Sequence, residues 1–154
     1  MLRAHPHLRG VLFDLPQVVE HAGPVLVAAG VADRCELLGG DFFISVPRGG
    51  DLYILSDIVH DWPDEAALAI LRNCRAATGN SARMVLSERP APERGEPTPY
   101  ARSVLMLDLN MLVRNGGRER TIDEHRALLA AAKFRLERIL PTAGPTSLLE
   151  AVPT

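Results

Sequence analysis

The stretch that decides the fold is Asp51–Glu65, DLYILSDIVHDWPDE. It begins with an apolar strand at 52–55, which ends in the polar pair Ser56–Asp57, and His60–Asp61 follow directly. A helix then opens at Pro63, because proline suits a first helical turn and the acidic residues after it suit the positive end of the helix dipole. This order places an imidazole and several carboxylates at the carboxyl end of a strand, where open α/β sheets bind ligands.

His60 is the residue of this stretch best suited to catalysis. A histidine held between a strand and a helix start is well positioned to act as a general base. The alternative is that His60 only caps or packs the turn between the strand and the helix. This segment alone favours that structural alternative, so other parts of the chain must decide.

Strands and helices alternate along the rest of the chain. Further strands are predicted at residues 10–13, 35–38, 83–87, 136–140 and 147–152. Helices are predicted at residues 16–22, 24–29, 63–78, 104–113 and 121–132, with a proline-rich loop at 90–99. This alternation predicts an α/β fold with a mostly parallel sheet. The short turn between the last two strands predicts an antiparallel hairpin at one edge.

Composition excludes several classes of function. The 154 residues are 47% hydrophobic and carry a net charge of −2, which argues against a disordered tail and against a nucleic-acid surface. Cys35 and Cys74 form no CxxC pair, which favours a reduced cytoplasmic protein. No apolar run reaches the roughly 20 residues of a membrane helix, and the amino terminus lacks the apolar core of a signal peptide. We therefore expect a cytoplasmic protein with no nucleic-acid or membrane partner.

Metal and nucleotide motifs are missing. The histidines at 5, 7 and 21 lack ligand spacing on a defined element, so no metal site is expected. The chain has no GxSxG, Walker or GxGxxG motif.

Two aspartates near strand ends are candidates for binding a nucleotide-like ligand. Asp14 directly follows a strand, where carboxylates commonly bind ribose hydroxyls. Capping the next helix is an equally good alternative for Asp14. Asp41 and Phe42 could bind an adenine amino group and pack on its ring. From these residues alone, an ordinary loop aspartate beside a core aromatic is the favoured interpretation.

Glu88 and Glu119 are candidate partners of His60. A carboxylate bonded to one ring nitrogen fixes the ring and stabilises the imidazolium that forms. Glu88 ends a predicted strand and should share an edge with His60, whereas Glu119 lies in a charged loop that solvent alone could explain. Met106 and Met111 could line an aromatic pocket, although methionines at helical spacing more often belong to a core.

Taken in order, six runs resemble the S-adenosylmethionine-dependent small-molecule O-methyltransferases of the caffeic-acid and isoflavone type, including bacterial antibiotic-tailoring enzymes. The runs are VLFDLP (11–16), LLGGDFF (37–43), GDLYILSDIVHDWPDE (50–65), VLSERP (85–90), GGRERT (116–121) and EHRALLAAAKF (124–134). Each run is weak alone, but six in this order with similar spacing are specific. The resemblance covers essentially the whole chain.

The resemblance implies a Rossmann-like class I methyltransferase sheet and transfer of a methyl group from S-adenosylmethionine to a hydroxyl of an aromatic or polyketide-like molecule. His60 would be the general base, flanked and oriented by Glu88 and Glu119. The cofactor would contact Asp14, Leu15, Asp41, Phe42 and Ser56. The hydroxyl acceptor would contact Asp61, Met106, Asn110 and Asn115. A phenol has a pKa of about 10, so proton removal by histidine during attack is useful chemistry.

The chain also departs from the family pattern. The family's amino-terminal dimerisation domain, first central strand and DxGxG loop do not occur among residues 1–154, so we expect a partial methyltransferase domain. The strands at 10–13 and 52–55 would then be unpaired edges unless they pair with each other. Lys133 stands where the family usually has a glycine, which would allow a left-handed helix end.

These departures leave alternatives open. We expect the 154-residue chain alone to bind S-adenosylmethionine weakly or not at all. The alternative function is a non-catalytic remnant that acts as an interaction module or is inactive. A nicotinamide-dependent enzyme is a third possibility, which the absence of GxGxxG disfavours. Family members form homodimers, but the sequence does not extend that to this chain.

Overall fold

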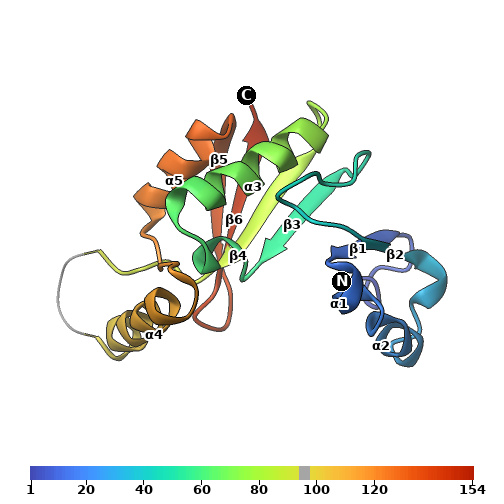
Figure 1. The fold of residues 1–154 in the computed structure, drawn as a ribbon, viewed down its shortest axis with the longest axis horizontal. Helices are drawn as coiled ribbons and strands as arrows, with labels where there is room; N and C mark the ends of the chain where they lie inside the picture. Colours follow the sequence, from blue (N-terminus) through green and yellow to red (C-terminus); the bar gives the residue numbers. More distant parts are fainter. Residues whose placement is uncertain (94–97) are drawn as a thin grey trace. The chain divides into compact units, whose positions relative to one another are not determined.

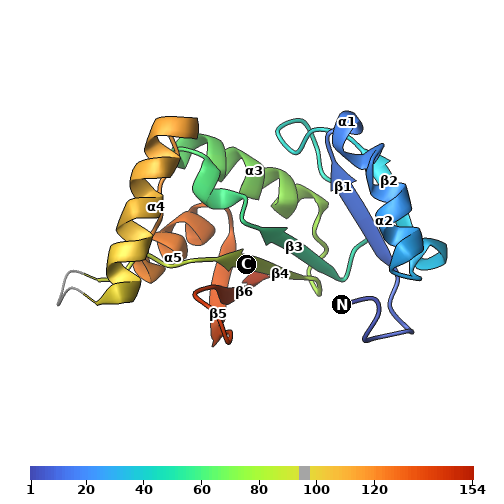
Figure 2. The same ribbon diagram turned by 90° about the horizontal axis from the view of Figure 1, so that it is seen from below.

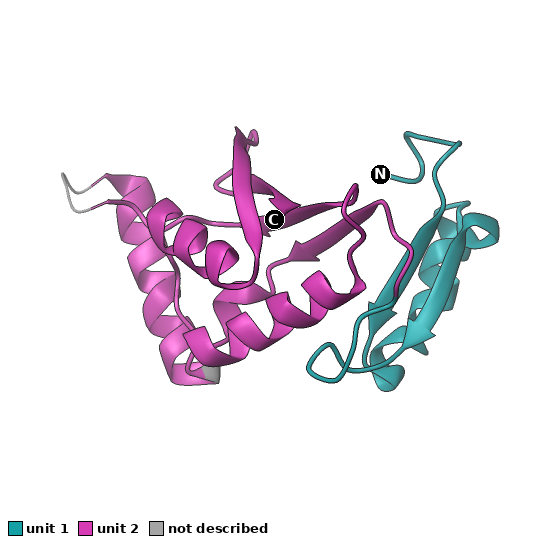
Figure 3. Cartoon of the chain, turned by 90° about the horizontal axis from the view of Figure 1, so that it is seen from above, with its two compact units in different colours: residues 1–47 teal, residues 48–154 magenta. Residues whose placement is uncertain are grey.

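The computed structural model describes residues 1–93 and 98–154, except for the side chain of Asn115. The middle of the predicted proline-rich loop, residues 94–97, lies outside the described residues. The chain divides into two compact units, residues 1–47 and residues 48–154 (Figure 3). Each unit is described by itself.

The first unit is a pair of parallel strands with short helices. Strand β1 (Gly10–Asp14) pairs in parallel with β2 (Cys35–Gly39). Between them the chain forms α1 (Pro16–Val19), α2 (Ala22–Ala28) and the 3-10 turn η1 (Ala32–Arg34). Pro16 opens α1 because it needs no amide partner in a first turn. The predicted strands of this unit are therefore confirmed to within a residue.

The second unit contains a four-stranded sheet in the order β3-β4-β6-β5. Its strands are β3 (Leu52–Ser56), β4 (Arg83–Glu88), β5 (Phe134–Pro141) and β6 (Ser147–Pro153). Strand β3 runs parallel to β4, whereas β6 is antiparallel to both β4 and β5. The predicted antiparallel hairpin is confirmed, with β5 at the edge (Figure 1). The α/β class holds, but the four-stranded sheet is mixed and not mostly parallel as predicted, with one parallel and two antiparallel pairings among the described strands.

In the described part of this unit, four helical segments accompany the sheet. They are the 3-10 turn η2 (Val59–Asp61), α3 (Asp64–Ala77), α4 (Pro99–Asn115) and α5 (Ile122–Ala131). Helices α3 and α5 lie beside each other along one face of the sheet, and α4 lies past its end, next to η2 (Figures 1 and 2). Segment η2 therefore lies between the end of β3 and α4.

The core of the second unit follows from helical periodicity. On α3 the buried residues recur at intervals of three or four residues. They are Ala67, Ile70, Leu71 and Cys74. Leu68 of the same helix is only half-buried. The rest of this core consists of buried side chains of the sheet and α5, namely Met84, Leu86, Leu128, Leu129, Phe134, Leu149 and Ala151.

The structure corrects several helix boundaries. Helix α1 ends at Val19 and not at 22, and α2 begins at Ala22 and not at 24. Helix α4 begins at Pro99 rather than near 104, because the Thr98 side chain accepts a hydrogen bond from the Ala101 amide and Pro99 occupies the first turn. The predicted capping box of α5 is confirmed, with Thr121 and Glu124 bonding each other's backbone amides. Lys133 has a φ of 64°, so the position does adopt the left-handed conformation that the family's glycine would favour.

Strands β1 and β3 each have one partner strand within their own unit. Among the described residues, β1 pairs with β2 and β3 pairs with β4. Apolar side chains on both strands are exposed, including Val11 at 52% and Ile54 at 44%. Such strands keep unpaired backbone groups on one side.

Candidate active site

The end of β3 turns sharply to present His60. Asp57 has a φ of 51°, a left-handed conformation that aspartate tolerates better than most residues. Its amide donates to the Ser87 carbonyl on β4, so the turn stays tied to the sheet. The next residues form η2, in which His60 is buried with 7% of its surface exposed. The local fold thus holds an imidazole next to the carboxyl ends of β3 and β4, as predicted.

Glu119 is the direct partner of His60. Its Oε1 lies 3.0 Å from His60 Nδ1, and its side chain is 1% exposed. A carboxylate only accepts hydrogen bonds, so Nδ1 carries the proton and Nε2 keeps its lone pair. His60 Nε2 lies 3.6 Å from Asp61 Oδ1. The ring therefore has one nitrogen fixed by Glu119 and the other available as a base.

Glu88 supports the same histidine from β4. Its side chain is fully buried, and its Oε1 accepts a hydrogen bond of 2.9 Å from the Val59 amide. Its Oε2 lies 4.0 Å from His60 Nδ1. Burial raises the pKa of Glu88 to about 7, although His60 opposes that shift. Glu88 therefore anchors the backbone of η2 and adds a second acidic group beside the ring.

The acidic surroundings favour the protonated form of His60. The hydrogen bond to Glu119 is the main reason that the pKa of His60 is raised above 6.5. Burial opposes this shift, whereas Glu88 and Asp61 add to it. His60 is thus a stronger base than a free histidine.

The loop that carries Glu119 packs closely on η2. Gly117 is needed there because a Cβ would clash with the carbonyl groups of His60 and Asp61. The Arg118 amide donates to the His60 carbonyl at 2.9 Å. The Glu119 amide donates to Asp108 Oδ1 of α4 at 2.7 Å. The charged loop is therefore an ordered part of the site, and the solvated interpretation of Glu119 is wrong.

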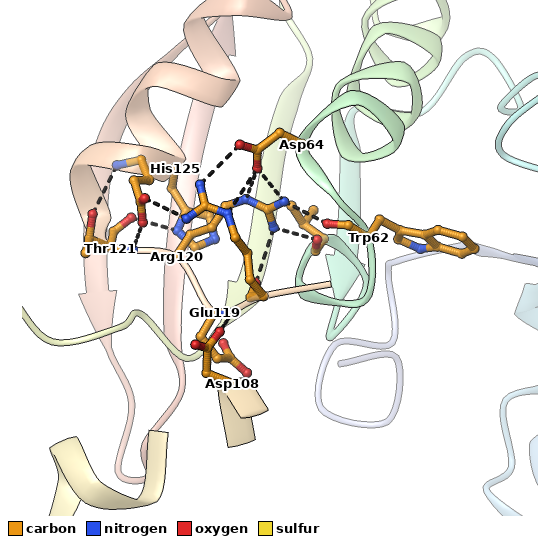
Figure 4. Close-up of polar contacts among 10 residues, drawn as sticks. Trp62, Asp64, Asp108, Glu119, Arg120, Thr121 and His125 are labelled. Carbon is orange, nitrogen blue, oxygen red and sulfur yellow. Dashed lines mark hydrogen bonds and ion pairs between the residues drawn. The ribbon is translucent and has the colours of Figure 1, made fainter. Parts of the chain in front are cut away.

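Sequence reasoning did not single out three residues of this region. Asp108 holds the Glu119 backbone, and Arg120 is buried beside Asp64 (Figure 4). His125 is also buried and contacts the Thr121 carbonyl through Nδ1 at 3.0 Å, and burial lowers its pKa. The glycine pair before Arg118 was the one available signal, because it marks close backbone approach.

The cofactor candidates belong mainly to the first unit. One carboxylate oxygen of Asp14 accepts from the Leu15 amide at 2.7 Å, so Asp14 turns the chain but does not cap α1. Asp41 Oδ1 accepts from the Phe43 amide at 2.8 Å. The Phe42 ring lies edge-on to Phe43, with centroids 5.0 Å apart. Leu15 is exposed.

Ser56, the remaining cofactor candidate, lies in the second unit. It is the last residue of β3 and is exposed. It precedes the turn that leads to His60, so it is at the same end of the sheet as the proposed base.

The acceptor candidates differ in their surroundings. Met106 is 67% exposed and Asn110 is also exposed, both on α4. Met111 is buried, which supports its core alternative. The side chain of Asn115 lies outside the described part of the structure. Other exposed apolar residues of α4 are Leu105, Leu109, Leu112 and Val113.

A shallow hollow of about 450 Å³ lies elsewhere on the second unit. It is lined mainly by the segment after β4, the start of α4 and the β5–β6 turn, including Pro90, Tyr100 and Pro145. His60, Glu88 and Glu119 do not line it. The chemical groups, and not this hollow, therefore define the candidate active site.

The described residues contain no group of histidines, cysteines and carboxylates arranged to hold a metal ion. Nor does any helix within the described ranges combine the length and apolar character needed to cross a membrane.

Comparison with known proteins gives one consistent family. A family model described as an O-methyltransferase domain matches residues 1–135. A phenazine O-methyltransferase from Lysobacter antibioticus is 49% identical over 153 residues, which are 99% of this chain and 44% of that protein. The O-demethylpuromycin-O-methyltransferase of Streptomyces alboniger is 43% identical, over 99% of this chain and 41% of that protein. The chain thus spans less than half the length of these relatives.

Solved structures agree. The crystal structure of LaPhzM aligns with a TM-score of 0.92 at 49% identity, over 99% of this chain and 45% of that one. An O-methyltransferase of neocarzinostatin biosynthesis, solved with S-adenosylmethionine and 2-hydroxy-5-methyl naphthoic acid, aligns with a TM-score of 0.88 at 31% identity, over 99% of this chain and 44% of that one.

Proposed function

Because this chain belongs to the family of O-methyltransferase domains, we propose that it supplies the catalytic base for methyl transfer from S-adenosylmethionine to a hydroxyl group. The proposed acceptor is an aromatic or polyketide-like small molecule. The observation that carries the proposal is the buried contact of 3.0 Å between His60 Nδ1 and Glu119 Oε1, which leaves Nε2 free to accept a proton.

The protein's part in the reaction is to align the acceptor and take its proton. His60 Nε2 would take the hydroxyl proton, and the O–H bonding pair would stay on the oxygen, so that an oxygen lone pair could form the bond to the methyl group. Glu119 stabilises the resulting imidazolium through Nδ1. The bound cofactor supplies a methyl group on a sulfonium, whose S–C bond electrons stay on sulfur. The proton then leaves His60 for solvent.

The residues present fit part of the cofactor. Asp14 and Asp41 are half-buried carboxylates near the ends of β1 and β2, and carboxylates suit ribose hydroxyls and an adenine amino group. Phe42 offers a ring face for adenine. We assign Asp14, Leu15, Asp41, Phe42 and Ser56 to cofactor binding. No residue among the 154 forms a DxGxG loop for the methionine end, so the fit covers the adenosine half.

The acceptor class rests on the relatives and on α4. The relatives named above act on phenazine and puromycin-type molecules, and one solved neighbour holds a naphthoic acid. The exposed apolar residues of α4 suit a flat aromatic ring. Asp61, Met106, Asn110 and Asn115 are our candidates for acceptor contact. A homodimer belongs to the same proposal, since the family resemblance implies one.

The second proposal is a non-catalytic remnant that acts as an interaction module or has no activity. The observation behind it is that residues 1–154 contain no DxGxG sequence. The two proposals differ in whether any methylated product forms.

A product assay tests the function. The encoded protein, meaning the polypeptide with any residues that flank this chain, is incubated with S-adenosylmethionine and a panel of hydroxylated benzoates, naphthoates and phenazines. We expect mass spectrometry to detect an O-methylated product, and the His60→Gln variant to form far less. Absence of product from every acceptor, in a protein that is folded and binds S-adenosylmethionine, would favour the remnant.

A further inference from the structure

Arg120 is a buried charge that the proposed mechanism does not use. Its side chain is 1% exposed. A buried guanidinium is costly unless its N–H groups find partners and its charge is matched. Its hydrogen bonds therefore indicate what the residue is for.

The guanidinium binds the segment that contains His60 from both sides. Arg120 Nη1 donates to the Val59 carbonyl at 2.7 Å, and Nη2 donates to the Trp62 carbonyl at 2.7 Å (Figure 4). Val59 directly precedes His60, and Trp62 follows it by two residues. The backbone on either side of the proposed base is thus held by one side chain.

Asp64 matches the charge of Arg120. Its Oδ1 accepts from Nη2 at 2.8 Å and from Nε at 3.0 Å. Asp64 opens α3, so the ion pair also fixes the guanidinium to a helix that packs on the sheet. The guanidinium therefore cannot shift without breaking several charge-assisted bonds.

The backbone of Arg120 joins the other two acidic partners. Glu119 directly precedes it in the chain. The Arg120 carbonyl accepts a hydrogen bond from the Ala91 amide at 2.8 Å, and Ala91 follows Glu88 by three residues. One residue thus contacts or adjoins the segments that carry His60, Glu88 and Glu119.

We propose that Arg120 is a positioning residue, which holds the imidazole of His60 at hydrogen-bond distance from the Glu119 carboxylate. The catalytic consequence rests on the proposed function, but the geometry exists with or without methyl transfer. Lysine cannot replace arginine here, because a single ammonium does not reproduce the planar fork that reaches two carbonyls and a carboxylate together.

The test compares Arg120→Lys with Arg135→Lys in the encoded protein. Arg135 on β5 is the matched control, because its guanidinium also binds a carboxylate, that of Glu137 at 3.1 Å, but is 62% exposed and has its ion-pair partner outside the candidate site. The first readout is an NMR titration of the His60 ring nitrogens, which reports its pKa and tautomer. The titratable groups that face His60 are Glu88, Glu119 and Asp61. The second readout is kcat and KM for methyl transfer.

In Arg120→Lys we expect the pKa of His60 to fall toward 6.5, because the contact with Glu119 loosens, and the fraction with hydrogen on Nδ1 to fall. We expect kcat to drop by about 100-fold, the order found when a reacting group is misplaced by about 1 Å, with KM little changed. Arg135→Lys should leave the titration and kcat as in the wild type.

An unchanged His60 titration in folded Arg120→Lys, with only a lower melting temperature, would overturn the proposal. A shifted titration in a protein that methylates nothing would keep the positioning role and refute the proposed function. If Arg120→Lys does not fold, Asp64→Asn weakens the hold on the guanidinium and keeps its bonds to the two carbonyls. In Asp64→Asn we expect a smaller fall in the pKa of His60. An unchanged pKa of His60 in that folded variant would equally overturn the proposal.

Discussion

The two units of this chain differ in what they bury. Among the described residues, the second unit buries seven polar or charged side chains, including His60, Glu88 and Glu119, together with most of the apolar core. The first unit buries only Val19 and Val31, and its cofactor candidates are half-buried or exposed. The proposed base is thus held by packing within its own unit. The proposed cofactor residues of the first unit, in contrast, are not part of a buried core. Substitutions in the two units should therefore affect different quantities.

The largest effect should come from the base in the second unit. His60→Gln removes the group that accepts the acceptor's proton, so turnover of the encoded protein should fall by roughly 10²–10⁴-fold. Steady-state kinetics with saturating substrates measures the loss. The control is His21→Gln at an exposed position of the first unit, which should leave turnover unchanged. A loss below about threefold in His60→Gln would make that residue structural.

Stability should depend on the core of the second unit. Leu71 is fully buried on α3, whereas Val25 in the first unit is 66% exposed. Leu71→Ala should lower the free energy of unfolding by about 2–5 kcal/mol, because it leaves a cavity, and Val25→Ala by less than about 0.5 kcal/mol. Denaturant titration gives both values. Equal losses would contradict the exposed position of Val25.

Cofactor affinity should depend on the first unit. Asp14→Ala and Asp41→Ala each remove a charged hydrogen-bond acceptor, so the Kd for S-adenosylmethionine should rise by about 10- to 100-fold. The free energy of unfolding should change by less than about 1 kcal/mol. Calorimetric titration of the encoded protein measures the Kd, with Asp33→Ala as the control, since that carboxylate is 77% exposed. An unchanged Kd in both variants would remove these aspartates from the cofactor site.

The smallest effect should come from the left-handed residue after α5. Lys133 has a φ of 64°, and glycine adopts this conformation without a side-chain penalty but loses more entropy on folding. Lys133→Gly should therefore raise the free energy of unfolding by roughly 0.5 kcal/mol. Lys133→Ala keeps a Cβ and should bring no such gain. Destabilisation by glycine would mean that the lysine side chain contributes more than the backbone strain costs.

Much of the second unit could be predicted because its signals are local. The end of β3, the proline and acidic residues that open α3, and the capping box of α5 each lie within a few residues. His60 and Glu88 could be placed at one edge, because parallel strands end on the same side. The start of α4 was also readable in Thr98–Pro99, but the proline-rich loop masked it.

The rest depends on contacts between distant segments. Arg120 follows two charged residues in the sequence, whereas Asp108 is an isolated carboxylate in the mostly apolar run 104–113. For a charged residue of either kind, a solvated side chain is the usual outcome. Only the folded chain shows that Arg120 reaches the Val59 and Trp62 carbonyls and that Asp108 holds the Glu119 amide. Periodicity and strand ends carry no information on such pairs. The sequence signal for that loop was the glycine pair 116–117, since a Cβ at Gly117 would clash with the backbone of η2.

The pH dependence of kcat/KM in wild type and Glu119→Gln tests most directly whether the His60–Glu119 pair is the base. Because Glu119 raises the pKa of His60 and only the neutral ring accepts a proton, wild-type activity should rise with pH to a break above pH 6.5. Removing the charge of Glu119 should move that break to lower pH and reduce the plateau. A break at the same pH in both proteins, or none above pH 6.5 in the wild type, would contradict the role of this pair.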